Sequence, residues 1–152
     1  MVRPIHHQVV VYASDPHTLA RFWSSAMGFV LEDNEGLIDQ VMAAGLAQES
    51  DVVVFDEHRY WKDGIAIRHP DDPADERTGI GRGRRILFEL QRTEKPDENR
   101  LHLDLNVGRD RLDEETGRLV ALGATLLYRR RQDPRGEFDR LTDPEGNEFC
   151  VQ

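Results

Sequence analysis

Apolar residues along this chain follow two spacings, one typical of strands and one typical of helices. Residues 101–107 (LHLDLNV) alternate apolar and polar side chains, and residues 7–13 (HQVVVYA) are rich in β-branched residues, so both predict strands. After the first of these, an apolar stripe at i, i+3, i+4 and i+7 predicts an amphipathic helix, formed by Leu19, Phe22, Trp23 and Ala26. A strand followed by a helix is therefore the first unit of structure that the pattern indicates.

Each predicted helix lies between an aspartate that is expected to cap its start and a glycine that is expected to end it. Asp15 and Pro16 take the N-cap and first helical positions, and Gly28 follows the last turn. Asp110 and Gly123 stand the same number of residues apart around a second helix. The buried side of this second helix is predicted to consist of Leu112, Leu119 and Val120. This internal repeat is the main organisational feature of the chain.

Further strands are predicted after each helix. They cover residues 29–31, 52–55, 64–68 and 86–91 in the first copy, and 124–128, 137–141 and 147–151 in the second. Turn sequences at 133–136 and 143–146 separate the last strands. The first copy also carries a short helix or loop at 35–50 and a segment rich in Pro, Gly and charge at 69–85, which predicts a mobile insertion.

These elements together predict an α+β fold built from two paired β-α-β-β-β modules. The first module spans residues 5–92 with its insertions, the second spans residues 100–152, and both belong to a single domain of residues 1–152. We expect the modules to form a cupped, mostly antiparallel sheet around a cavity, into which the strands present polar side chains. The sequence leaves open whether the modules pair within one chain or between two.

Composition and charge narrow the class of partner. The 152 residues include 29 acidic and 20 basic ones and carry a net charge of −9, which argues against a nucleic-acid partner. A single cysteine excludes an internal disulfide, and no apolar stretch approaches the roughly 20 residues of a membrane helix. We therefore expect a cytoplasmic protein with no membrane partner. The basic runs at 82–85 and 129–131 are interpreted as solvated charges paired with acidic residues, or as an anion-binding rim.

The modules resemble the vicinal oxygen chelate superfamily, which includes glyoxalase I, bleomycin-resistance proteins and extradiol dioxygenases, and most closely its glyoxalase-like proteins. The motifs that carry the resemblance are residues 7–11 with 15–16, 21–23 and 27–29 in the first module, and 99–105, 119–124 and 143–150 in the second. The resemblance implies a small-molecule ligand held by the concave sheets, and a homodimer. It also implies that a metal, where present, is held by one residue near the start of the first strand and one near the end of the last strand of each module.

Strand alternation indicates which second-module residues those are. Leu101, Leu103, Leu105 and Val107 are expected to face the helix, which directs His102, Asp104 and Asn106 to the cavity. Phe149 and Val151 are expected to face the core, so Glu148 and Cys150 should also point into the cavity. The predicted metal ligands of this module are His102 and Cys150.

In the first module the same argument selects Gln8 and Glu89. If Val9, Val11 and Ala13 face the helix, the cavity side consists of Gln8, Val10 and Tyr12, with Glu89 contributed by the strand at 86–91. A competing register pairs His7, in place of Gln8, with His102 and turns Val9 and Val11 into the cavity. We prefer Gln8, because the apolar faces of the two modules then agree. The predicted metal set is therefore Gln8, Glu89, His102 and Cys150.

This set leaves the chemistry open. By resemblance, three of its members match one form of glyoxalase I, in which a glutamate that binds the metal and moves a proton stands where Cys150 stands here. A thiolate can bind Zn, Ni, Mn or Fe but cannot replace that carboxylate, so Glu89 or Glu148 would have to move the proton. An extradiol dioxygenase needs two histidines and a carboxylate on Fe(II), and only His102 and Glu89 fit unless His7 joins them.

Two function hypotheses follow. The first is a metal-dependent lyase or isomerase acting on a small oxygenated molecule, with Tyr12, Asp104 and Asn106 contacting the ligand. The second is a metal-free protein that binds or sequesters a small molecule such as an antibiotic, as the resemblance to bleomycin-resistance proteins implies. In that case His102 would simply hydrogen-bond to Asp104 on the same face of the strand, and Cys150 would be a small buried apolar residue.

Overall fold

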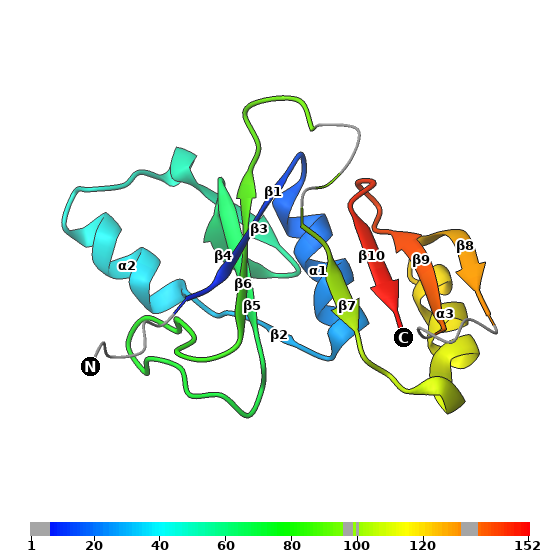
Figure 1. Ribbon diagram of the computed structural model, residues 1–152. Coiled ribbons are helices and arrows are strands. Elements are labelled where there is room, and N and C mark those ends of the chain that lie inside the picture. Colours follow the sequence, from blue (N-terminus) through cyan, green and yellow to red (C-terminus); the bar gives the residue numbers. More distant parts are fainter. Residues whose placement is uncertain (1–6, 96–98, 100, 132–136) are drawn as a thin grey trace, which may run out of the picture. The chain divides into compact units, whose positions relative to one another are not determined.

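The computed structural model describes residues 7–95, 99, 101–131 and 137–152, and it divides into two compact units, residues 1–92 and 93–152 (Figure 1). Both units combine helices with a mostly antiparallel sheet, so the predicted α+β class is confirmed. In the part of the chain that the structure describes, no helix is both long and apolar enough to cross a bilayer.

The first unit is built on a four-stranded sheet of order β1-β6-β5-β2. Its strands are β1 (Val9–Ala13), β6 (Arg85–Leu90), β5 (Gly64–Arg68) and β2 (Val30–Leu31). The first and last of these along the chain, β1 and β6, pair in parallel, and the other pairs are antiparallel. Helix α1 (Pro16–Met27) packs on β5 and β6 of this sheet, and the buried core residues of these elements include Leu19, Trp23, Ile65, Ile67 and Phe88.

Helix α1 begins and ends where the sequence predicts. The Oδ1 atom of Asp15 accepts a hydrogen bond from the Thr18 amide at 3.1 Å, and Pro16 occupies the first helical position. At the other end Gly28 has a φ of +68°, a left-handed conformation that favours glycine, and its N–H bonds to the carbonyl of Ser24. The N-cap aspartate and the C-terminal glycine of this copy are thus confirmed.

The first copy carries a helix and a hairpin between β2 and β5. They comprise α2 (Glu35–Ala43), the short 3-10 turn η1 (Glu49–Asp51), β3 (Val52–Phe55) and β4 (His58–Trp61). The sequence predicts β3 but misses β4, because the two residues that turn the hairpin are Asp56 and Glu57. Both have positive φ, 50° and 69°, in a position where glycine or asparagine is the usual indicator of a hairpin turn.

The segment predicted to be a mobile insertion, residues 69–85, is held by carboxylates. Glu32, which is fully buried, accepts a hydrogen bond from the Gly81 amide at 2.7 Å. Asp75 accepts from the amides of Arg77 and Thr78 at 3.0 Å each, and it forms an ion pair with Arg82. The basic run at 82–85 is therefore paired with acidic side chains, as predicted, although one of these partners is buried.

We expect the Asp75 loop to lose its stabilisation only at very low pH. The Arg82 guanidinium, followed by the amides of Thr78 and Arg77, lowers the pKa of Asp75 from 3.8 to about 2. Because the folded-state pKa lies below the unfolded value, the stabilisation is complete above pH ~4 and is lost as the pH falls through the folded pKa. The Thr78 amide shift, followed by NMR, should titrate with a midpoint near the folded-state value, and Asp75→Asn should remove this step. A midpoint near pH ~4 in the folded chain would contradict the expectation.

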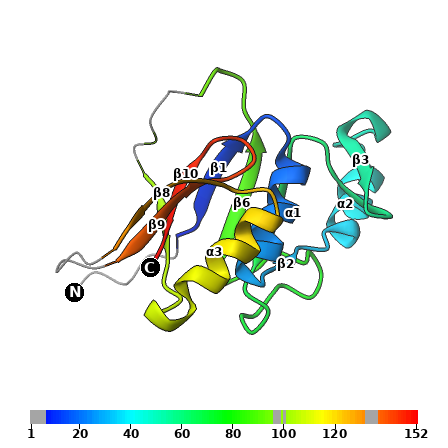
Figure 2. The same ribbon diagram turned by 90° about the vertical axis from the view of Figure 1, so that its right-hand side faces the viewer.

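The second unit repeats the strand order of the first, as β7-β10-β9-β8. Its strands are β7 (Leu103–Leu105), β10 (Glu148–Val151), β9 (Phe138–Thr142) and β8 (Thr125–Arg130). Again the first and last strands, β7 and β10, pair in parallel, and the other pairs are antiparallel. Helix α3 (Leu112–Ala121) packs along one face of β8, β9 and β10, and its Leu119 lies in the core with Phe149 (Figure 2).

Three details of this unit correct the sequence prediction. Asp110 does not cap the helix: it lies within the 3-10 turn η2 (Arg109–Arg111), and no side chain caps α3. Three acidic residues in the first turn, at 113–115, instead stabilise the start of the helix by interacting with the positive end of its dipole. Val120 and Leu101, predicted to be buried, are 43% and 86% exposed. The predicted turn at 143–146 is present, whereas the one at 133–136 lies outside the described residues.

Candidate metal centre

The strands of the second unit present polar side chains on the sheet face opposite α3. In β10, Phe149 and Val151 are fully buried, so Cys150 between them points to the other face. In β7 and the residue before it, His102 and Asp104 are exposed while Leu103 is half-buried. Alternation thus brings one imidazole, one carboxylate and one thiol to a common face.

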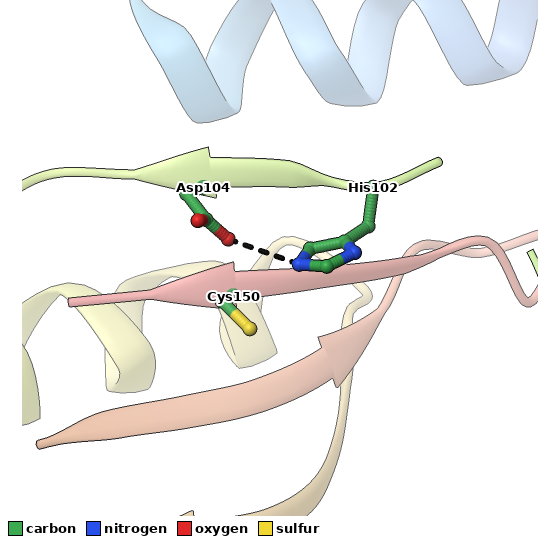
Figure 3. Close-up of side chains that lie close together, drawn as sticks. All are labelled: His102, Asp104 and Cys150. Atoms are coloured by element: carbon green, nitrogen blue, oxygen red, sulfur yellow. Dashed lines mark ion pairs between the residues drawn. The ribbon is translucent and has the colours of Figure 1, made fainter. Parts of the chain in front are cut away.

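These three side chains lie close enough to share one ion. Their ligand atoms are all within 4.8 Å of one another, and Nε2 of His102 lies 3.2 Å from Oδ1 of Asp104 (Figure 3). The parallel ladder explains the proximity, because Cys150 of β10 is level with Asp104 of β7. We name this group, His102, Asp104 and Cys150, the second-unit cluster.

The surroundings of the Cys150 thiol favour its protonated form over the thiolate. Burial raises the pKa of Cys150, the nearby Arg140 guanidinium opposes this effect, and the carboxylate of Asp104 adds to it. Arg140 also donates a hydrogen bond from Nη1 to Sγ over 3.4 Å. A divalent cation that binds here would displace the thiol proton, since the thiolate is the ligand form of cysteine.

The donor set of the cluster fits a catalytic metal site. Three protein ligands that leave further positions open are typical of catalytic zinc, whereas closed sets of four are typical of structural zinc. A sulfur and an imidazole nitrogen together favour Zn(II) or another late first-row ion over a hard cation such as Mg²⁺. The half-exposed side chains of His102 and Asp104 leave room on the solvent side for a small molecule.

Glu148 lies next to the cluster on the same face. It precedes Cys150 by two residues in β10, and one step along the parallel ladder from the Phe149–Leu103 pair places it level with His102. Its side chain is half-buried. Asn106 lies further along the chain, where its amide oxygen accepts from Gln152 at 3.0 Å, so it is a neighbour of Asp104 and outside the ligand triad.

The first unit places its predicted residues differently. Tyr12 and Glu89 face each other across the parallel β1–β6 ladder, whereas Gln8, just before β1, accepts a hydrogen bond from Arg85. Four residues of register, or about 13 Å of strand, separate Gln8 from Glu89. The structure therefore does not bring these two side chains together, and their part in a metal site stays a prediction. Val11 and Ala13 are more buried than Tyr12, whereas Val9 and Val10 are both 41% exposed, so the choice between Gln8 and His7 stays a prediction.

Asp104 was predicted to contact the bound small molecule and was not among the predicted metal ligands. The signal was available, because a residue two positions after His102 on a strand must share its face. Arg140 was missed altogether, although it alternates with the apolar Leu141 of β9 and so has to lie on the same face as Cys150. Both omissions come from searching only the positions that the resemblance supplied.

The chain contains two copies of a strand–helix unit whose last strand is parallel to its first, and the second copy carries metal-type ligands on its open sheet face. These features define a protein of the vicinal oxygen chelate class. A family model described as a glyoxalase-like domain matches residues 8–152, so the chain belongs to that family. No curated protein matches the chain.

Solved structures show the same fold at low sequence identity. A glyoxalase/bleomycin resistance protein/dioxygenase family enzyme from Burkholderia phytofirmans PsJN is 17% identical, with a TM-score of 0.60, over 95% of this chain and 94% of that one. The fosfomycin resistance protein FosX from Mesorhizobium loti is 11% identical, with a TM-score of 0.61, over 100% and 92%. A mutant of FosX from Listeria monocytogenes, complexed with Mn(II) and 1S,2S-dihydroxypropylphosphonic acid, is 12% identical, with a TM-score of 0.63, over 100% and 92%.

Proposed function

We propose that this glyoxalase-like protein is a metal-dependent enzyme, of the lyase or isomerase type, that transforms a small oxygenated molecule. The observation that carries the proposal is the second-unit cluster, in which the ligand atoms of His102, Asp104 and Cys150 lie within 4.8 Å of one another. The FosX structure that holds Mn(II) and a dihydroxylated phosphonic acid supports it as a relative of the same fold. In a metal-free sequestering protein, His102 and Asp104 would form only a hydrogen-bonded pair and Cys150 would only pack, so the metal content separates the two functions.

Each residue of the proposed site has a distinct task. A metal bound by the cluster would act as a Lewis acid toward a carbonyl or a pair of vicinal oxygens. Asp104 and His102, whose Oδ1 and Nε2 atoms lie 3.2 Å apart, would bind the metal side by side together with Cys150. Glu148 is a carboxylate outside the cluster that is level with His102 on this face, and it is proposed to accept or return the substrate proton.

The first unit adds residues whose role rests on the sequence. Glu89 and Tyr12 are side by side on their ladder, and we propose that they contact the substrate or, for Glu89, supply a further ligand or the proton-transfer base. Gln8 is retained as a proposed ligand in spite of its bond to Arg85, which it would have to give up. Metal stoichiometry in Gln8→Ala and Glu89→Ala separates these roles, because removal of a ligand should lower the metal content, whereas removal of a substrate contact should leave it unchanged.

Cobalt binding tests the proposed function. Protein purified without chelator or affinity metal should contain near-stoichiometric metal, and after its removal one equivalent of Co(II) should produce a thiolate-to-cobalt charge-transfer band in the near ultraviolet. The band should disappear in Cys150→Ser and weaken strongly in His102→Ala. His58→Ala, at an exposed histidine outside the cluster, is the matched control and should leave it unchanged. No metal in the wild type, even after reconstitution, would overturn the proposal.

A further inference from the structure

The sheet face that carries the second-unit cluster continues into a positively charged row. Cys150 is level with Arg140 across the β10–β9 ladder, and Arg140 is level with Tyr128 across the β9–β8 ladder. With Asp104 on the other side of Cys150, one side chain from each of the four strands lies in a single line across the sheet. Directly paired residues share a face of a sheet, so the line runs from the cluster to Tyr128 on the face opposite α3.

A β-bulge places Tyr128 in this line. Leu126 pairs with Leu141, but the next paired residue of β8 is Tyr128, opposite Arg140, which leaves Leu127 as an extra residue. In a regular ladder Leu127 would lie opposite Arg140, and Tyr128 would point to the other face. Bulges are frequent beside active sites, where they redirect a side chain. Here the bulge exchanges an apolar residue for a phenol next to the guanidinium.

Arg140 is a half-buried cation that forms no salt bridge among residues 7–95, 99, 101–131 and 137–152. It contacts the sulfur of Cys150 and the hydroxyl of Tyr128, and the carboxylate of Glu148 attracts it without a salt bridge. Other partly buried arginines, Arg85 and Arg131, each bond to at least one buried carboxylate. A guanidinium has five N–H donors, and two contacts leave several of them for an incoming group.

Arg130 adds a second cation to the face that carries Arg140, where Glu148 and Asp104 supply negative charge. Arg130 lies over the ring of Phe138, 5.0 Å from its centroid, and that ring meets Tyr128 edge-on at 6.0 Å. Phe138 alternates with the buried Asp139, which faces α3 and accepts from the Thr116 hydroxyl at 2.8 Å. Phe138 and Arg140 therefore share the open face. Arginine and tyrosine beside each other are a donor set suited to an oxyanion.

We propose that Arg140 and Tyr128 form an anion-binding subsite beside the second-unit cluster, so that the substrate carries a carboxylate or phosphonate group next to the oxygens that the metal would hold. The inference rests on the proposed function and narrows its substrate class from small oxygenated molecules to small oxygenated anions. In this arrangement the guanidinium binds the anion through paired N–H donors, the phenol adds one O–H donor, and the adjacent substrate oxygens reach toward His102 and Asp104.

Two small probes, one with a carboxylate and one with a hydroxyl in its place, test the subsite. Glycolate and ethylene glycol both offer two neighbouring oxygens, but only glycolate has a carboxylate. In Zn(II)-loaded protein we expect glycolate to bind at least about tenfold more tightly, measured by NMR titration of the amides of residues 128, 140 and 150. A metal alone also favours a carboxylate, so the decisive comparison is Arg140→Gln, which should lower glycolate affinity by about tenfold and leave ethylene glycol unchanged.

Further variants show whether Arg140 binds the anion or only supports the thiol of Cys150. Arg140→Lys keeps the charge without the two-pronged geometry and should retain an intermediate affinity, and Tyr128→Phe should lose a few-fold. Arg118→Gln, on helix α3 against the other sheet face, is the matched control and should bind glycolate like the wild type. If Arg140→Gln lowers zinc content but not the preference for glycolate, Arg140 supports Cys150 only and the subsite is refuted.

Inorganic phosphate and the metal-free protein distinguish a failure of the subsite from a failure of the proposed function. Phosphate binding to the metal-free protein that weakens in Arg140→Gln supports the subsite even if no metal ever loads. Stoichiometric zinc together with glycolate binding that is indifferent to Arg140 overturns the subsite and leaves the metal site intact. Zinc content is measured in every variant, so each titration is assigned to a known metal state.

Discussion

Replacing Cys150 with serine is expected to lower the affinity for Zn(II) about 100-fold or more, which corresponds to ~2.7 kcal/mol of binding free energy. The thiolate is the one soft ligand of the second-unit cluster, and a serine hydroxyl of nearly the same shape stays protonated and binds zinc poorly. Competition with a chromophoric chelator measures the affinity. The unfolding midpoint of the metal-free variant shows whether the fold is retained.

A second substitution at position 150 tests whether the metal needs an anionic ligand there. Cys150→Asp restores an anionic ligand of the harder type and should recover part of the zinc affinity while shifting the preference toward Mn(II). Because Cys150 is almost fully buried, both variants also bring a new polar group into the sheet, which is why the metal-free stability is compared. Wild-type zinc affinity in Cys150→Ser would show that the thiol is a packing residue and would leave His102 and Asp104 as an ordinary ion pair.

The parts of the site that could be predicted are those that depend on strand period alone. The alternation at 101–107 places His102 and Asp104 on one face, and the apolar residues Phe149 and Val151 turn Cys150 to the same face. These positions meet because the module is a repeat whose first and last strands pair in parallel, and the repeated Asp and Gly positions indicate that repeat. Local periodicity and a single topological rule were therefore enough for this half of the site.

The parts that could not be predicted depend on register and on single backbone conformations. The turn at Asp56 and Glu57 adopts positive φ without glycine, so the hairpin it makes has no sequence indicator. The extra residue Leu127 moves Tyr128 to the open face, and nothing in the sequence of β8 announces a bulge. Likewise the four-residue offset between Gln8 and Glu89 is a property of the β1–β6 ladder, which alternation within either strand does not determine.

Charge pairing shows the same limit of sequence reasoning. The basic run at 82–85 was interpreted as solvated charge, and Arg82 and Arg84 do pair with acidic residues at the surface. Arg85 instead reaches a glutamate that no pattern marks as buried, because Glu32 follows β2 directly in a stretch of polar residues. The pair is buried because residues 69–85 fold over it, as the bond from the Gly81 amide to Glu32 shows. Such a tertiary contact cannot be predicted from the residues next to Glu32.

Replacing Glu32 with alanine is expected to lower the free energy of unfolding by about 3–5 kcal/mol, the typical cost of leaving one partner of a buried ion pair uncompensated. Glu32 is 1% exposed, and its two oxygens accept from Nε and Nη2 of Arg85 at 2.7 and 2.8 Å. One of them also accepts from the Gly81 amide, so the substitution leaves the Gly81 N–H without its partner and the largely buried guanidinium of Arg85 without its carboxylate, with Gln8 still bonded to it. Urea denaturation of wild type and variant measures the loss.

Two further variants show whether the ion pair itself is responsible. The double variant Glu32→Leu with Arg85→Met removes both charges and should recover most of the loss, leaving about 1–3 kcal/mol for the unpaired Gly81 amide. Glu76→Ala, at an exposed glutamate of the same 69–85 segment, should change stability by less than ~0.5 kcal/mol. Arg85 is the first residue of β6 and also bonds to Gln8, which precedes β1. The Glu32–Arg85 pair therefore holds together the start of the β1–β6 ladder, in which Tyr12 later pairs with Glu89. A loss below ~1 kcal/mol in Glu32→Ala would mean that water replaces the carboxylate and that this end of the sheet is held by apolar packing alone.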